Sequence, residues 1–176
     1  MYKRILVPLD GSDLAEAVLY FASILASHND AEIVLLRVAE YPSEMYSLCY
    51  EYPPIDPEMA AELEKKKRAL CLEAKHYLEE LSARLEVSGQ TVLVKVCDGP
   101  VVNAILDTAE EMHVDLIVMS THGHSGYEHR MIGTTSDRVL YEANMPVLLV
   151  RAIPNLSVPN RLLQWHVFPQ QVTPIK

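Results

Sequence analysis

The sequence predicts an α/β protein built on one doubly wound, five-stranded parallel sheet. Two observations predict this fold: short apolar runs of strand length alternate with segments of helical apolar spacing, and the runs are continuously apolar. Strands that read this way are buried on both faces, as in parallel sheets covered by helices. The 176 residues, 49% of them hydrophobic and 22% charged, suit one domain with an ordinary core.

The first strand is expected at residues 5–9, where an apolar run ends in an Asp-Gly-Ser turn signal. Helical apolar spacing then predicts a helix over about residues 13–27. Ser12 or Asp13 can cap this helix, and Glu16 stands where a capping box with Asp13 would need it. The residues expected on its inner face are Leu14, Val18, Phe21, Ala22 and Leu25.

A second strand is expected at residues 33–38. Four prolines and four tyrosines in residues 40–57 argue against regular structure and predict an excursion loop. A long helix is expected over residues 58–86, with Gly89 marking its end, and a third strand at residues 91–96. The inner face of the long helix is expected to hold Met59, Leu63, Leu70, Ala74, Tyr77, Leu81 and Leu85.

The same alternation continues to residue 150. Gly99 and Pro100 open a further helix, which leads to a fourth strand at residues 116–119 and a loop rich in glycine and histidine. A helix over about residues 135–143 and a last strand at residues 146–150 complete five strands and four helices. The inner face of the helix after Pro100 is expected to hold Val102, Ile105, Leu106, Ala109 and Met112.

Residues 152–176 differ in composition from residues 1–151, which we expect to form the domain. This C-terminal extension holds four of the 11 prolines, no acidic residue and the only tryptophan. A partly ordered tail is one interpretation. The other is an oligomerisation arm that docks on a neighbouring subunit. Without such docking the arm would expose four large apolar side chains to water, those of Leu162, Leu163, Trp165 and Phe168.

Composition excludes several classes of protein. With 15 Lys and Arg against 24 Asp and Glu the net charge is −9, so the basic footprint of a nucleic-acid-binding protein is missing. The first apolar run breaks at Pro8 and Asp10 and is too short for a signal peptide or a membrane span. Cys49, Cys71 and Cys97 are widely spaced, as expected for reduced thiols in a cytoplasmic protein.

Two strand ends carry the residues that a ligand site needs. Ligands of open parallel sheets bind beyond the carboxyl ends of the strands, where the strand order reverses. The first strand is followed by the polar residues 10–12 and the fourth by the glycine-containing loop 120–126. Gly133, Thr134 and Thr135 then stand at the start of a helix, where free amides and hydroxyls attract anions. This pattern favours a phosphate site, although such glycines also occur in plain turns.

A polyphosphate at these loops would be held mainly by backbone donors and a divalent cation, Mg²⁺ or Mn²⁺, with Arg130 as the nearest guanidinium. Competing sites are weaker. The P-loop pattern G-x4-G-K-[S/T] is absent. His122, His124 and His129 suggest a transition-metal site, but no cysteine or paired carboxylate joins them in the loop.

Beyond these local patterns, the sequence resembles the universal stress protein family over about residues 2–151. The matching segments are residues 5–12, Val38, Gly99 with the following helix, residues 115–120, residues 123–126, Gly133 with Thr134, and residues 146–150. ATP-binding members carry G-x2-G-x9-G-[S/T], which aligns with Gly123, Gly133 and Thr134, while Ser120 replaces the first glycine. The resemblance implies the strand order 3-2-1-4-5, which places the first and fourth strands side by side.

The resemblance also implies where an adenine nucleotide (ATP, ADP or AMP) would bind. The Val38 backbone would meet the adenine edge, and Pro8 and Leu9 would pack against the base. Asp10 would accept hydrogen bonds from the ribose hydroxyls or lie near the metal ion, unless it serves the turn. The residues expected around the sugar and the phosphates are Met119, Ser120, His122, Gly123, His124, Ser125, Gly126, Gly133, Thr134 and Thr135.

We therefore expect an ATP-binding universal stress protein that acts as a stress-response or signalling module. At most slow ATP hydrolysis is expected, because fast phosphoryl transfer needs positioned cations that the motifs do not supply. A nucleotide-free homodimeric interaction protein of the same fold is the alternative, which Ser120 in the motif keeps open. A slow ATPase is a third reading. The resemblance implies a homodimer through the last strand, which begins at Pro146 and ends at Val150.

Overall fold

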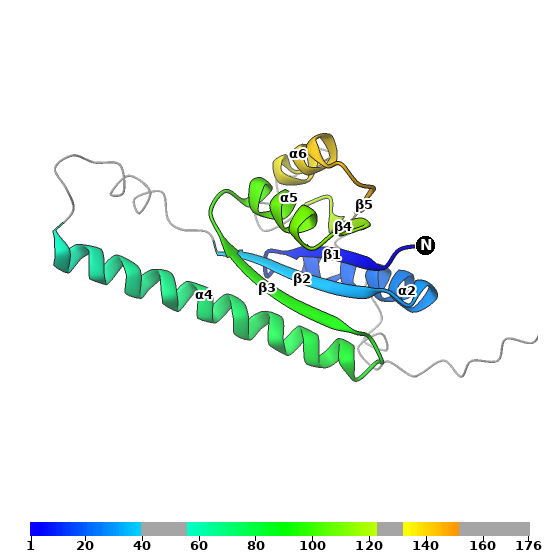
Figure 1. Cartoon of the computed structure of the whole chain (residues 1–176), viewed down its shortest axis with the longest axis horizontal. Helices are drawn as coiled ribbons and strands as arrows, with labels where there is room; N and C mark the ends of the chain where they lie inside the picture. The colour runs from blue at the N-terminus through cyan, green and yellow to red at the C-terminus, as the bar shows by residue number, and fades with distance from the viewer. Residues whose placement is uncertain (40–55, 123–131, 152–176) are drawn as a thin grey trace, which may run out of the picture.

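The computed structural model describes residues 1–39, 56–122 and 132–151. Its five strands form one parallel sheet in the order β3-β2-β1-β4-β5, as predicted. Helices lie on both faces of this sheet (Figure 1). Most of the expected excursion loop and the whole C-terminal extension lie outside the described residues.

Strand β1 (Arg4–Leu9) occupies the centre of the sheet, between β2 (Glu32–Ala39) and β4 (Leu116–Ser120). Strands β3 (Val92–Asp98) and β5 (Val147–Val150) form the two edges. The three inner strands are almost completely buried, because the sheet is covered on both sides. All strand bounds agree with the predicted ones to within two residues.

Each face of the sheet has its own core. Helices α2 (Val18–Asn29) and α4 (Pro57–Glu86) pack on one face, whereas α5 (Val101–Glu111) and α6 (Thr134–Glu142) pack on the other. Successive strand residues alternate between the two cores, since neighbouring side chains point to opposite faces of a sheet. No described helix combines the length and the apolar character that crossing a membrane requires.

The helix expected over residues 13–27 is interrupted at Ala17, which separates α1 (Asp13–Glu16) from α2. The expectation that Phe21 faces the core was wrong: its side chain is exposed, and Leu19 is buried. The buried face of α2 includes Leu19 and Ser23 and leaves Phe21 at its edge.

The start of α1 also differs from the predicted capping box. Ser12 is the N-cap, and its Oγ accepts a hydrogen bond from the Ala15 amide at 3.2 Å. A capping box between Asp13 and Glu16 does not form, because the third helical position after Ser12 is Ala15. Glu16 instead forms a salt bridge with Arg84 of α4 at 3.6 Å.

Helix α4 matches the predicted long helix, but only part of it is buried. Met59, expected on the inner face, is 48% exposed, whereas Leu78 is completely buried. The N-terminal part of α4 runs past the carboxyl ends of β2 and β3 (Figure 1), and the buried residues of the helix begin at Ala74. A continuous apolar pattern in the sequence does not reveal where the sheet beneath the helix ends.

Candidate functional site

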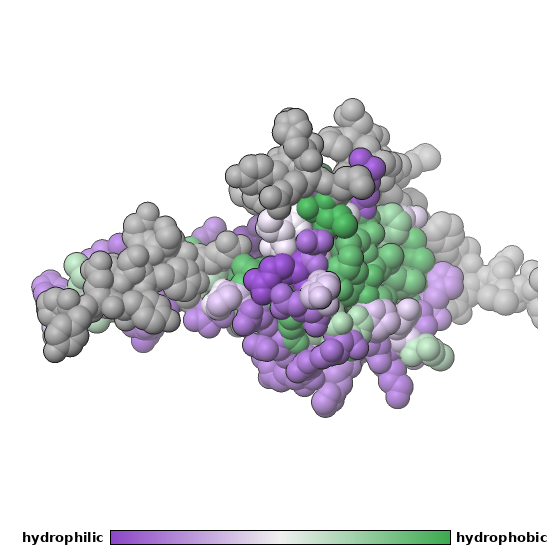
Figure 2. Space-filling model, turned by 90° about the horizontal axis from the view of Figure 1, so that it is seen from above, coloured by the Kyte–Doolittle hydropathy of each residue, from purple (hydrophilic) through white to green (hydrophobic). Residues whose placement is uncertain are grey.

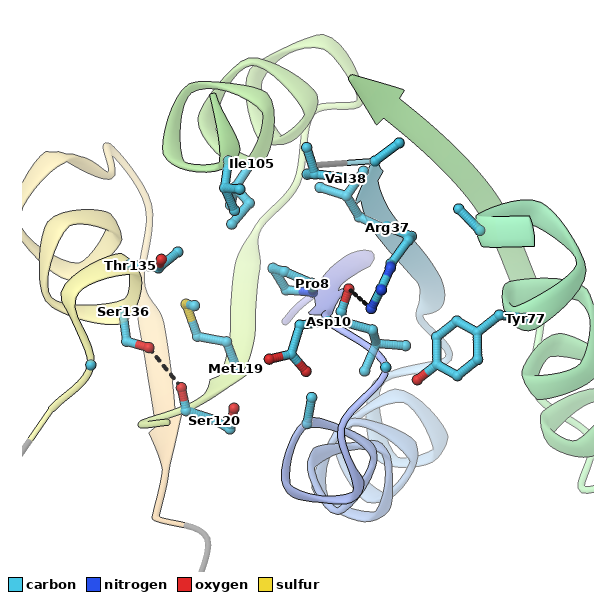
Figure 3. A pocket seen from close by; sticks show the side chains of 18 of the residues that line it. Pro8, Asp10, Arg37, Val38, Tyr77, Ile105, Met119, Ser120, Thr135 and Ser136 are labelled. Carbon is cyan, nitrogen blue, oxygen red and sulfur yellow. Dashed lines mark hydrogen bonds between the residues drawn. The ribbon is translucent and has the colours of Figure 1, made fainter. Parts of the chain in front are cut away.

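A cleft of about 870 Å³ lies at the carboxyl ends of β1, β2 and β4 (Figure 3). Its position follows from the topology. The chain leaves β1 toward α2 on one face and leaves β4 toward α6 on the other, so a crevice remains between the two neighbouring strand ends. The cleft therefore lies beside the two strand ends, those of β1 and β4, at which the sequence predicted a ligand site.

Nine of the expected site residues line this cleft, and they come from four separate segments of the chain. They are Pro8, Leu9, Asp10, Val38, Met119, Ser120, Gly133, Thr134 and Thr135. His122 is described but is not among the lining residues; its Nδ1 lies 3.0 Å from Thr121 Oγ1. The remaining expected residues lie outside the described part of the chain: Gly123, His124, Ser125 and Gly126, together with Arg130.

Asp10 organises the turn at the end of β1. Its Oδ1 accepts hydrogen bonds from the Ser12 amide at 3.0 Å and from the Ser12 hydroxyl at 2.6 Å. Gly11, between them, has a φ of 82°, a left-handed conformation that glycine adopts without strain. This carboxylate therefore holds the N-cap of α1 in place and at the same time lines the cleft.

The start of α6 forms the opposite wall. The Gly133 amide is already used, because it donates to the Thr121 carbonyl oxygen at 2.7 Å. The first hydrogen bond within α6 runs from the Asp137 amide to the Gly133 carbonyl oxygen. The amides at positions 134–136 precede this bond and have no partner within the helix. Three donors thus remain at the positive end of the helix dipole.

The two small residues around this wall have clear steric or hydrogen-bonding roles. A Cβ on Gly133 would lie 3.0 Å from the Thr121 carbonyl oxygen, so a larger side chain would push α6 away from β4. The Ser120 hydroxyl, which stands where the family motif has glycine, donates to the His122 carbonyl oxygen at 2.6 Å. The Ser136 hydroxyl in turn donates to the Ser120 carbonyl oxygen at 2.8 Å (Figure 3).

Two cleft residues, Arg37 and Tyr77, were missed in the sequence. The Arg37 guanidinium lies 5.6 Å from the centroid of the Tyr77 ring, and its Nη1 lies 3.5 Å from the Leu9 carbonyl oxygen. Arg37 had a signal, since it is the only charged residue in the apolar run 33–39. No signal in the sequence identifies Tyr77 as a site residue, because it reaches the cleft only through the packing of α4 on the sheet.

Burial raises the pKa of the Tyr77 phenol well above its ordinary value, and the negative charge of Glu16 raises it further. The nearby Arg37 guanidinium opposes this shift without cancelling it. Tyr77 therefore keeps its proton at neutral pH. Among the described residues, no group of three or more His, Cys, Asp or Glu side chains could hold a metal ion.

Comparison with known families decides the identity of the fold. The model of the universal stress protein family matches residues 1–151. The chain belongs to the universal stress protein family. Universal stress protein MJ0531 of Methanocaldococcus jannaschii is 31% identical over 151 residues, which cover 86% of this chain and 83% of that protein. The solved structure of MJ0577, described there as a hypothetical protein, has a TM-score of 0.73 and 29% identity, over 86% of this chain and 96% of that one.

Two more distant universal stress protein structures contain adenine nucleotides. One, a complex with cAMP, has a TM-score of 0.58 at 20% identity and covers 86% of this chain and 98% of that one. The other, from Arabidopsis thaliana with AMP bound, has a TM-score of 0.54 at 15% identity and covers 86% and 92%. At these identities the likeness establishes a shared fold.

Proposed function

We propose that the cleft binds an adenine nucleotide, ATP, ADP or AMP, and that the protein acts as a nucleotide-responsive module of the stress response. The observation that carries this proposal is the start of α6, where the amides of Thr134, Thr135 and Ser136 meet the cleft. Such amides and the helix dipole attract phosphate even in an acidic protein. The cAMP and AMP complexes of two proteins with this fold support the choice of base.

The rest of the cleft suits a base and a sugar. Val38, Ile105 and Met119 are buried apolar residues that offer a flat base an apolar wall, and Pro8 lies among them (Figure 3). Asp10 lies near the centre of the cleft in the same view, between Met119 and Arg37. A nucleotide with its phosphates at α6 would present its ribose hydroxyls to this carboxylate.

The same geometry favours binding over rapid turnover. A polyphosphate would bring Mg²⁺ or Mn²⁺ with it, which would offset its charge against the net −9 of the chain. Among the described lining residues the only cation is Arg37, which lies on the opposite side of the cleft from Thr135 and Ser136 (Figure 3). Fast phosphoryl transfer needs cations at the transferred group, so hydrolysis is at most slow.

Gly133→Val tests the proposed phosphate position. The added side chain must displace the start of α6, given the 3.0 Å between a Cβ there and the Thr121 carbonyl oxygen. We expect the affinity for ATP with magnesium, measured by calorimetry, to fall at least about tenfold, because hydrogen bonds to a charged group are lost. Ala69→Val, on the exposed face of α4 outside the cleft, is the matched control and keeps the affinity.

Heat denaturation of the purified wild-type protein provides a second readout, the release of bound adenine nucleotide. No released nucleotide and no heat on titration with ATP, ADP or AMP would overturn the proposed ligand. That result would favour a nucleotide-free interaction protein. An unchanged ATP affinity in a folded Gly133→Val variant would show instead that the phosphates bind elsewhere.

We also propose a homodimer through β5. Within the described residues this strand pairs with β4 on one side only, and the Leu148 side chain is 38% exposed. The side of the molecule that carries α6 and β5 shows a compact hydrophobic area (Figure 2). An open strand edge with apolar side chains favours pairing with a second copy across a two-fold axis. Residues 152–176 are proposed as an arm that extends this assembly.

A further inference from the structure

The cleft continues past the proposed nucleotide site to a second region, on the α4 side of the sheet. We call this region, lined by Arg37, Tyr77, Leu70, Glu73 and Ala74, the α4 end of the cleft. None of these residues belongs to the set that the family motif implies. The region combines the Arg37 cation and the Tyr77 phenol with the apolar Leu70 and Ala74, and with the Glu73 carboxylate, which is exposed to water.

Most N–H groups of the Arg37 guanidinium have no hydrogen-bond acceptor among the described residues. The seven salt bridges of the described part of the chain do not include it. Its guanidinium lies against the backbone of Gly11, where a Cβ would be 2.8 Å from Nη1, and near the face of the Tyr77 ring. The 3.5 Å contact with the Leu9 carbonyl oxygen occupies one of its five N–H groups. A half-buried guanidinium held by neutral groups attracts an anion.

Tyr77 supplies a second, independent observation. Its hydroxyl oxygen is buried and has no hydrogen-bond partner among the described residues. Glu16 lies close to this phenol and raises its pKa both through its negative charge and as a hydrogen-bond acceptor, although no hydrogen bond between the two side chains meets ordinary geometry. Figure 3 shows the phenol oxygen pointing into the cleft below Arg37. Buried hydroxyls are rarely left without a partner, so an acceptor atom on a ligand would complete this site.

We propose that Arg37 and Tyr77 form a second anion subsite, and that the ligand is an adenosine nucleotide with a further phosphate on its ribose 2′ or 3′ hydroxyl. This inference rests on the proposed function, because it takes the first phosphate to lie at α6. Arg37 and the start of α6 lie on opposite sides of Asp10 (Figure 3), so one linear polyphosphate anchored at α6 leaves Arg37 unused. A phosphate on the ribose, beside Asp10, points toward this guanidinium.

The chemistry has a general precedent. In dinucleotide-binding folds an acidic residue binds a free ribose hydroxyl, whereas a nearby arginine accommodates a phosphate at the same position. Here one Asp10 oxygen already accepts two hydrogen bonds from Ser12, and the Arg37 guanidinium lines the same cleft. The planar guanidinium can bind a phosphate through two parallel N–H groups, to which the Tyr77 hydroxyl would add a third donor.

The test compares three ligands by calorimetry: AMP, adenosine 2′,5′-bisphosphate and adenosine 3′,5′-bisphosphate. We expect one bisphosphate to bind the wild-type protein at least about tenfold more tightly than AMP, the gain from a charge-assisted contact. In Arg37→Gln this ratio should fall to near one, and Arg37→Lys should keep only part of it because the planar fork is lost. Tyr77→Phe should lower the ratio as well. Lys75→Gln, exposed on α4, changes the net charge equally and keeps the ratio.

The outcomes separate the two proposals. Equal affinities for AMP and both bisphosphates in the wild-type protein would overturn the second subsite and leave the nucleotide site standing. A ratio that survives in Arg37→Gln, or that falls equally in Lys75→Gln, would also overturn it. Failure of these three ligands to bind, with ATP and ADP also giving no heat, would overturn the proposed function, and the second subsite with it. If ATP binds and these three ligands do not, only the second subsite is overturned.

Discussion

Single side chains join the strands to their neighbours at both ends of the sheet. At the carboxyl end, the buried Ser136 hydroxyl donates to the Ser120 carbonyl oxygen and docks α6 on β4. At the amino end, the Asp115 carboxylate accepts hydrogen bonds from the Lys3 amide at 2.6 Å and the Arg4 amide at 2.9 Å. These two bonds hold the pKa of Asp115 below its ordinary value of 3.8.

Asp115→Asn should lower the free energy of unfolding at neutral pH by less than about 1 kcal/mol, because the hydrogen bonds weaken while water screens the exposed carboxylate. A depressed pKa means that the contribution is complete above pH 3.8 and is lost as the pH falls through the folded-state pKa. Urea unfolding of both proteins near neutral pH and near pH 3 measures this. A difference that stays constant between the two pH values would contradict the assignment.

Helix α4 both packs on the sheet and lines the cleft. From Ala74 onward its inner face is buried against β2 and β3, which fixes the helix on the sheet. Tyr77, in this anchored part, reaches the cleft, whereas the N-terminal turns of α4 extend beyond the sheet (Figure 1). Because the same helix anchors the fold and lines the cleft, its two faces should tolerate substitution very differently.

Leu78→Ala should lower the free energy of unfolding by about 2–5 kcal/mol, because it leaves a cavity at a fully buried position. Leu72→Ala, on the same helix with 55% of the side chain exposed, is the matched control and should change it by no more than about 0.5 kcal/mol. Urea unfolding midpoints of the two variants give the comparison. Similar losses in both would mean that α4 is not packed as described.

The molecule combines a net charge of −9 with an apolar β5 edge that no other strand of the described part of the chain pairs with. Two acidic copies repel one another, but salt screens this repulsion beyond a Debye length of about 8 Å at physiological ionic strength. Contact between apolar strand edges and added backbone pairing must then provide the attraction. The proposed dimer should accordingly be sensitive to a charge placed on β5.

Light scattering during size-exclusion chromatography should give the mass of a dimer for the wild-type protein and of a monomer for Leu148→Lys. A buried like-charge pair at a two-fold interface opposes association. Val87→Lys, with 85% of the side chain exposed after the end of α4, is the matched control and should remain dimeric. A monomeric wild-type protein would contradict the dimer, and a dimeric Leu148→Lys would place the interface elsewhere.

The strands and the cleft position could be predicted because they depend on signals that are local in the chain. Continuous apolar runs predict buried parallel strands. The turns at the strand ends, together with the family motif, predicted a set of site residues, nine of which line the cleft. Phe21 and Met59 were misplaced, because apolar spacing shows neither which side of α2 meets the sheet nor where the sheet beneath α4 ends. Arg37 stands out in the sequence as the only charged residue in an apolar run, but no motif identified it as a site residue.

The sequence by itself determined the order of the elements, the strand residues and the chemistry available at two strand ends, because hydrophobic period and turn residues act over a few neighbours. Only the tertiary structure decided which donors still face the cleft. The Gly133 amide is used by Thr121, whereas Arg37 and Tyr77 come together from β2 and α4. Such pairings depend on packing between segments far apart in the chain, which no local pattern encodes.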